Sequence, residues 1–202
     1  MKLHFALASP YVRKVRAVAI ELGLDDRIEL LERAITPVSP EEALNADNPL
    51  GKIPCLIADD GQAFYDSRVI CEYLDSLTNG KKMLPEEGVV RFTALRRQAL
   101  ADGILDAAVG KRYETFLRPG DVQWQPWIEA QTAKYNQALD QLEGDAASFG
   151  ETVDIGTIAI ACAAGYMDFR YGGENWRKGR DNLAAWYGAF AKRPSMMTTA
   201  PV

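Results

Sequence analysis

Residues that bind metals or build disulfide frameworks are scarce in this sequence. The 202 residues include one histidine, His4, and three cysteines, Cys55, Cys71 and Cys162. Neither the histidine nor the widely separated cysteines give a zinc-ligand spacing, so we expect no metal site. An odd number of cysteines in apolar surroundings is typical of reduced core thiols. We therefore expect a cytoplasmic protein without disulfides.

Excess positive charge and long apolar runs are also missing. The chain has 23 Lys and Arg against 28 Asp and Glu, a net charge of −5, which argues against a nucleic-acid-binding surface. No apolar run approaches the roughly 18 residues of a membrane span, and the N-terminus lacks a signal-peptide pattern, so we expect no membrane partner. A hydrophobic content of 48% and 202 residues suit one large globular domain or two small ones.

The segment from residue 3 to residue 22 carries the clearest pattern in the chain. A short apolar run at 4–8 predicts a buried strand, and His4 is expected to be a packed residue within it. Apolar residues then recur at helical spacing, with Ser9 at the expected N-cap and Pro10 at the first helical position. Such a junction offers backbone N–H groups and a helix dipole to an anion. Because Ser9 and Val12 stand where a dithiol protein needs cysteines, the anion must come from a ligand.

Two types of domain follow one another along the chain. Residues 1–77 alternate strand and helix patterns, with further strands expected at 27–34, 53–58 and 63–65 and a second helix ending at residue 77. Residues 78–88 are rich in turn formers and charges and are typical of a linker. Residues 89–202 show only helical patterns, including a nearly all-apolar helix at 155–169. The fold class predicted is therefore an α/β domain followed by an all-α bundle.

Two further stretches of the α/β domain offer polar groups. Pro54 stands at the entry to a strand, where a cis bond is a reasonable suspicion, and such a bend turns the Ile53 backbone towards an extended peptide-like ligand. Asp66 and Ser67 precede the second helix, where they present N–H groups and a hydroxyl to a carboxylate. Each stretch is also explained by a purely structural role, as a bend or a helix cap.

Taken together, these motifs resemble the cytosolic glutathione transferases, bacterial and serine-type, over almost the whole chain. The first half resembles the thioredoxin-like domain of that family, and the second half resembles its helical domain. The matching segments, in chain order, are Ser9-Pro10-Tyr11-Val12-Arg13-Lys14, Asn48-Pro49-Leu50-Gly51-Lys52-Ile53-Pro54, Phe64-Tyr65-Asp66-Ser67 with Ile70-Cys71-Glu72-Tyr73-Leu74, and Arg193-Pro194-Ser195.

The resemblance implies a role for each matching residue. Ser9 corresponds to the catalytic hydroxyl that hydrogen-bonds the glutathione sulfur. The implied glutathione-binding residues are Lys52 near the glycine carboxylate, Ile53 with Pro54 at the cysteinyl part, Asp66 and Ser67 at the γ-glutamyl group, and Asp102, which some classes extend across a dimer interface.

The sequence departs from the family pattern at two places. Glutamate is more usual than the aspartate found at position 66. At the start of the apolar helix the family usually has Ser or Thr followed three residues later by Asp, whereas here Asp154 precedes Thr157. A cap is still expected there, but the usual box is not present as such.

The implied function is glutathione transfer to an electrophilic, apolar substrate, as in detoxification, by a cytoplasmic homodimer. Glutathione is the co-substrate, and the helical domain is expected to form the electrophile pocket. One alternative is a non-catalytic adaptor of the same fold, like the stringent-starvation regulators. Another is a glutathione-dependent reductase or peroxidase, which the serine at position 9 disfavours as a dithiol enzyme.

Overall fold

A computed structural model describes residues 1–201, and the chain divides into two compact units. The first unit contains Met1–Glu86 together with the chain from Pro194 onward, and the second contains Glu87–Arg193. The C-terminal segment, which we assigned to the helical domain, thus belongs to the first unit. Its short helix α8 (Pro194–Thr198) begins at Pro194, a favourable first helical residue, and packs against α1 (Pro10–Glu21).

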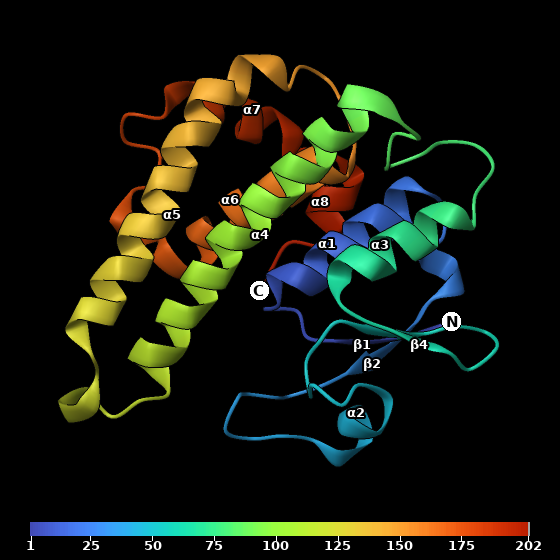
Figure 1. Ribbon diagram of the computed structural model, residues 1–202, viewed down its shortest axis with the longest axis horizontal. Helices are drawn as coiled ribbons and strands as arrows, with labels where there is room; N and C mark the ends of the chain where they lie inside the picture. Colours follow the sequence, from blue (N-terminus) through green and yellow to red (C-terminus); the bar gives the residue numbers. More distant parts are fainter. Residues whose placement is uncertain (202) are drawn as a thin grey trace. The chain divides into compact units, whose positions relative to one another are not determined.

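The first unit is built on a four-stranded sheet with helices on both faces (Figure 1). The strand order is β2-β1-β3-β4, in which β1 runs parallel to β2 and antiparallel to β3, and β3 runs antiparallel to β4. Helices α1 and α3 cover one face, and α2 lies on the other. The strand and helix bounds are β1 Lys2–Phe5, β2 Glu29–Glu32, α2 Glu42–Asp47, β3 Cys55–Ile57, β4 Ala63–Phe64 and α3 Ser67–Ser76.

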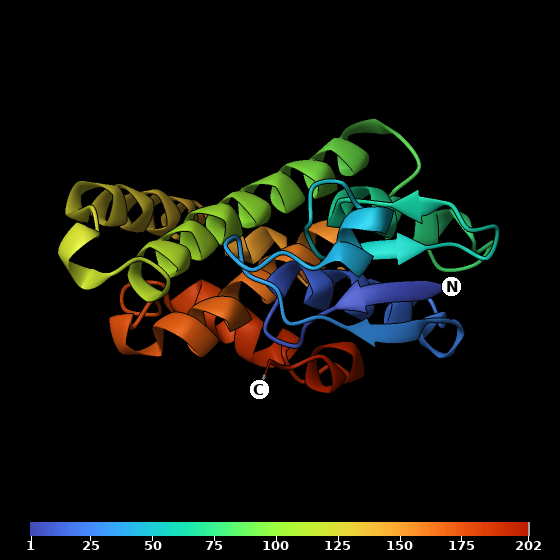
Figure 2. The same ribbon diagram turned by 90° about the horizontal axis from the view of Figure 1, so that it is seen from below.

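The second unit contains only helices, as the sequence predicts. Its α-helices are α4 Gly88–Phe116, α5 Gln125–Asp145, α6 Ile155–Tyr171 and α7 Asp181–Phe190. The long helices α4 and α5 lie side by side, and α6 packs against α4 (Figures 1 and 2). Helix α6 is buried along nearly its whole length, which confirms the interpretation of its apolar sequence. Within residues 1–201, no helix is both long and apolar enough to cross a bilayer.

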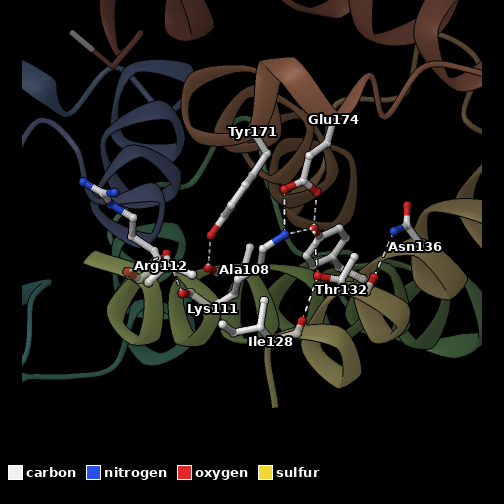
Figure 3. A network of polar contacts seen from close by, with 10 residues as sticks. Ala108, Lys111, Arg112, Ile128, Thr132, Asn136, Tyr171 and Glu174 are labelled. Carbon is white, nitrogen blue, oxygen red and sulfur yellow. Dashed lines mark hydrogen bonds and ion pairs between the residues drawn. The ribbon is translucent and has the colours of Figure 1, made fainter. Parts of the chain in front are cut away.

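A buried ammonium group connects three elements of the second unit (Figure 3). Lys111 Nζ on α4 donates to the Tyr135 hydroxyl at 2.9 Å and to Glu174 at 2.6 Å, while the Tyr135 hydroxyl also bonds Glu174. Burial opposes the charge on Lys111, but its hydrogen bonds to Glu174 and Tyr135 raise the pKa of the ammonium above its usual value. The network fixes α4, α5 and the segment that follows α6.

The start of α6 has a reciprocal capping box. Asp154 Oδ1 accepts the Thr157 backbone N–H at 2.9 Å, and Thr157 Oγ1 accepts the Asp154 backbone N–H at 3.0 Å. From the sequence we expected a cap here but not the usual capping box. The residue order is indeed reversed, with Asp154 before Thr157, but both hydrogen bonds of the box are formed. The two side chains are interchangeable here because a carboxylate and a hydroxyl both accept a hydrogen bond from a backbone N–H.

Candidate functional site

Strand pairing brings the polar stretches of the first unit to one end of the sheet. His4 pairs with Cys55 in the antiparallel β1–β3 ladder, so the turn after β1 and the segment before β3 share an end. Leu56 pairs with Phe64 in the antiparallel β3–β4 ladder, so the chain leaving β4 reaches that same end. Three loops therefore converge there: residues 6–9, 48–54 and 65–67.

Ser9 occupies the N-cap of α1, as the sequence predicts. Its backbone N–H donates to Ala6 O at 3.0 Å, which closes a tight turn after β1. The predicted strand at 4–8 therefore ends at Phe5. Ser9 Oγ accepts the Val12 backbone N–H at 3.3 Å, and the side chain is half-buried. Because this bond uses a lone pair of the oxygen, it leaves the hydroxyl proton to serve as a donor.

The loop before β3 is held from within by Asn48, which is 1% exposed. Its Nδ2 donates to Lys52 O at 2.8 Å, and its Oδ1 accepts the Leu50 backbone N–H at 3.1 Å. Gly51 has a φ of +60°, a left-handed conformation that favours glycine, and a Cβ there would also require the Asn45 side chain, whose oxygen would lie 2.7 Å away, to move. The sequence indicated a turn here but gave no sign that Asn48 is its buried anchor.

Lys52, Ile53 and Pro54 leave this loop and lead into β3. The Ile53–Pro54 peptide bond is cis, as suspected from the proline at the strand entry. Because these residues directly precede β3, they lie at the same end of the sheet as Ser9. Lys52 is exposed there, and Ile53 is half-buried.

Asp66 caps α3 and accepts the Arg68 backbone N–H at 2.9 Å. The Tyr65–Asp66 peptide bond is cis as well. The Asp66 carboxylate is exposed, whereas Ser67 is 2% exposed at the first position of the helix. The helix start therefore combines an exposed acid with backbone N–H groups, as expected from the sequence.

Asp102 is not among the residues that the sheet brings together. It lies on α4 in the second unit and is 2% exposed. Its implied role towards glutathione stays a prediction.

The cysteines are buried and do not form disulfides. Burial, followed by the negative charge of Asp47, raises the pKa of the Cys55 thiol to about 11. A thiol of this kind is a poor nucleophile at neutral pH, which agrees with its interpretation as a core residue. Among residues 1–201, no three His, Cys, Asp or Glu side chains are grouped to hold a metal ion.

Known proteins match the chain over both units. The family model described as glutathione S-transferase, N-terminal domain, matches residues 8–77, and the model for the C-terminal domain matches residues 125–189. A relative in Escherichia coli K12, described as the uncharacterized GST-like protein YibF, is 34% identical over 100% of this chain and 98% of its own length.

Solved structures show the same two-part fold. A glutathione transferase family member from Pseudomonas fluorescens Pf-5 with bound glutathione is 46% identical, with a TM-score of 0.98 over 100% of this chain and 98% of that one. A second structure from that organism, with bound S-(propanoic acid)-glutathione, is 43% identical, with a TM-score of 0.93 over 100% of this chain and 99% of that one.

Proposed function

The chain belongs to the glutathione S-transferase family, and from that premise we propose that it binds glutathione and transfers the sulfur to an electrophilic, apolar acceptor. The observation that carries the proposal is the convergence of three loops at one end of the sheet. Together they offer a hydroxyl, a backbone N–H and C=O beside the cis proline, and a capped helix start, which are the groups that an anionic tripeptide thiol needs. Relatives 43–46% identical to this chain hold glutathione or a glutathione thioether.

Each loop has a proposed part in holding the tripeptide. The Ile53 N–H and C=O pair with the cysteinyl backbone, and the Lys52 ammonium faces the glycine carboxylate. At α3, the Ser67 N–H and hydroxyl bind the γ-glutamyl carboxylate, while the Asp66 carboxylate pairs with the γ-glutamyl ammonium. These groups bind and orient, so they act on the affinity for glutathione more than on the transfer step.

Ser9 is the proposed catalytic residue, because two effects meet at its position. Ionising most of a free thiol at neutral pH requires its pKa to fall by about two units, roughly 3 kcal/mol. The N-terminus of α1 supplies about 0.3–1 kcal/mol, up to ~2 where partly buried. A hydroxyl hydrogen bond to an anion adds about 1.5–3 kcal/mol. The helix N-terminus alone falls short of this requirement, whereas the two contributions together, about 2–5 kcal/mol, span it. The thiolate then attacks the electrophilic carbon, and the leaving group departs with its electron pair.

The remaining parts of the proposal concern the acceptor, the assembly and the location. The helical unit supplies the apolar acceptor pocket. The active species is a homodimer, for which exposed apolar side chains at the start of α4 are the candidate contact: Val89, Val90 and Phe92. The proposed location is the cytoplasm, which suits three buried cysteines that form no disulfide.

Calorimetry with glutathione, followed by an ultraviolet titration of the bound thiol, tests this function. We expect saturable binding and a thiolate band that persists about two pH units below that of free glutathione. Conjugation of a chlorodinitrobenzene would then show transfer. Absence of binding at millimolar glutathione contradicts the proposal and favours the adaptor of the same fold. Binding without a thiolate shift indicates a protein that only holds the ligand.

A further inference from the structure

Both ring nitrogens of the buried His4 are engaged. His4 is 1% exposed on β1, with Nε2 2.8 Å from Asp47 Oδ2 and Nδ1 2.8 Å from Arg33 Nε. The Nε–H of an arginine only donates, so Nδ1 must be the unprotonated nitrogen. Nε2 therefore carries the proton and donates it to Asp47. The two partners fix both the tautomer and the orientation of the ring.

The histidine and its arginine hold α2 at both ends. Asp47 is the last residue of α2, and Glu41, at the N-cap, is bound by Arg33 Nη1 at 2.9 Å. Arg33 itself is fixed beside β1, because its backbone N–H donates to Phe5 O at 2.8 Å. A helix of six residues is not stable on its own, so its position depends on these attachments.

The attachment continues directly into the proposed glutathione site. Asn48 follows Asp47, and its side chain bonds the backbone of Leu50 and Lys52. His4 thus connects through its hydrogen bond to Asp47, the Asp47–Asn48 peptide bond and the hydrogen bond of the Asn48 side chain to the residue before Ile53. By contrast, Ser9 is held by its own turn and helix, which do not take part in this path.

We propose that His4 is a positioning residue for glutathione. By holding Asp47, it sets the place of the segment from Asn48 to Ile53, whose last two residues bind the tripeptide. This inference rests on the proposed function. Its consequence is specific: disturbing the His4–Asp47 bond weakens glutathione binding while leaving the ionisation of the thiol at Ser9 unchanged.

The experiment compares four variants by calorimetry and by steady-state kinetics with a chlorodinitrobenzene. In His4→Leu and Asp47→Ala we expect the Kd and KM for glutathione to rise roughly tenfold, with kcat within about twofold of wild type. Asp47→Asn keeps an oxygen that accepts from Nε2 and should retain near-wild-type affinity. Lys111→Met breaks a buried polar network in the second unit and controls for lost stability, and its KM should not change.

The outcomes separate this inference from the function on which it rests. A wild-type chain that binds no glutathione overturns both. Wild-type binding with an unchanged KM in Asp47→Ala overturns the inference alone, as does a fall in kcat at constant KM. Equal losses in Asp47→Asn and Asp47→Ala also contradict it, because positioning then does not pass through this hydrogen bond. Since Asp47 lies partly exposed at a helix end, its variants decide the question even if His4→Leu does not fold.

Discussion

At the scale of single residues, Ser9 carries the proposed chemistry, and Ser9→Ala is its direct test. We expect turnover with glutathione to fall tenfold or more, because the hydroxyl contributes about 1.5–3 kcal/mol to an anion and each ~1.4 kcal/mol is a factor of ten. The substitution also removes the bond from the Val12 N–H, at a cost of about 1 kcal/mol in stability. Kinetics with a chlorodinitrobenzene and a thermal melt measure the two effects separately.

Ser9→Thr is the matched control, since threonine keeps both the hydroxyl and the cap. It should retain most of the activity. An unchanged rate in Ser9→Ala would mean that another group activates the thiol.

Cys55 gives a prediction about pH that does not depend on glutathione. Its pKa is raised to about 11, so the folded protein favours the neutral thiol, and only about one in a thousand is ionised at pH 8. The stability gained from this neutral form is present below pH 9, the ordinary pKa, and is lost as the pH rises towards 11. In a Cys71→Ala/Cys162→Ala background, alkylation by iodoacetamide should be slow at pH 8 and about tenfold faster for each unit of pH.

Mass spectrometry of the alkylated peptide gives the rate, and the same chain in guanidinium serves as the reactive reference. Asp47→Asn should accelerate alkylation, because it removes a negative charge that helps to raise the thiol pKa. Modification of the folded protein as fast as the unfolded one would show that Cys55 is accessible and its pKa ordinary.

At the scale of elements, the contact between α4 and α6 depends on Gly156. A Cβ at this position would lie 2.7 Å from Ala94 O and 2.8 Å from Arg97 Cβ. Gly156→Ala should therefore destabilise the protein by about 1–3 kcal/mol, although alanine favours a helix by ~1 kcal/mol. Urea unfolding measures the change.

Gly103→Ala on α4 provides the comparison, because an added Cβ there has no neighbour within 4 Å. This variant should gain up to about 1 kcal/mol. A stabilised Gly156→Ala protein would mean that α4 and α6 do not approach this closely.

Local signals in the sequence were sufficient for α1 and α3, but they did not predict the short helix α8. Ser9 and Asp66 cap α1 and α3 as predicted, since a cap involves only residues within one turn. Strand ends were less accurate: the predicted strand at 27–34 forms only at Glu29–Glu32, where β1 offers a pairing partner. The residues of one strand do not show how far its pairing partner extends, so they do not fix where the strand ends.

Long-range contacts set the limit of the sequence analysis of the site. We expected the three stretches to converge if residues 1–77 folded as predicted, and the strand order places them at one end of the sheet. The bond between His4 and Asp47 joins residues 43 apart, and no periodicity or motif connects them. The sequence indicated a packed histidine, which is correct, but not the polar path that passes through it.

At the scale of the whole molecule, the exposed apolar side chains of α4 predict a dimer. Val89, Val90 and Phe92 are 81%, 66% and 71% exposed at the start of α4, and grouped apolar side chains of this size mark an association surface. We expect light scattering after gel filtration to give about twice the chain mass of 22.3 kDa. Phe92→Glu should shift the protein to the monomer, because a dimer would bury the introduced carboxylate without a partner.

Phe116→Glu tests whether this effect belongs to the start of the helix. Phe116 lies at the other end of α4 and is also well exposed, at 61%, so its substitution introduces the same charge on the same helix. If the dimer forms at the Val89–Phe92 end, Phe116→Glu remains dimeric while Phe92→Glu does not. The reverse pattern would place the contact at the far end of α4. A monomeric wild type would remove the dimer from the proposal and leave Asp102 without a partner subunit to reach.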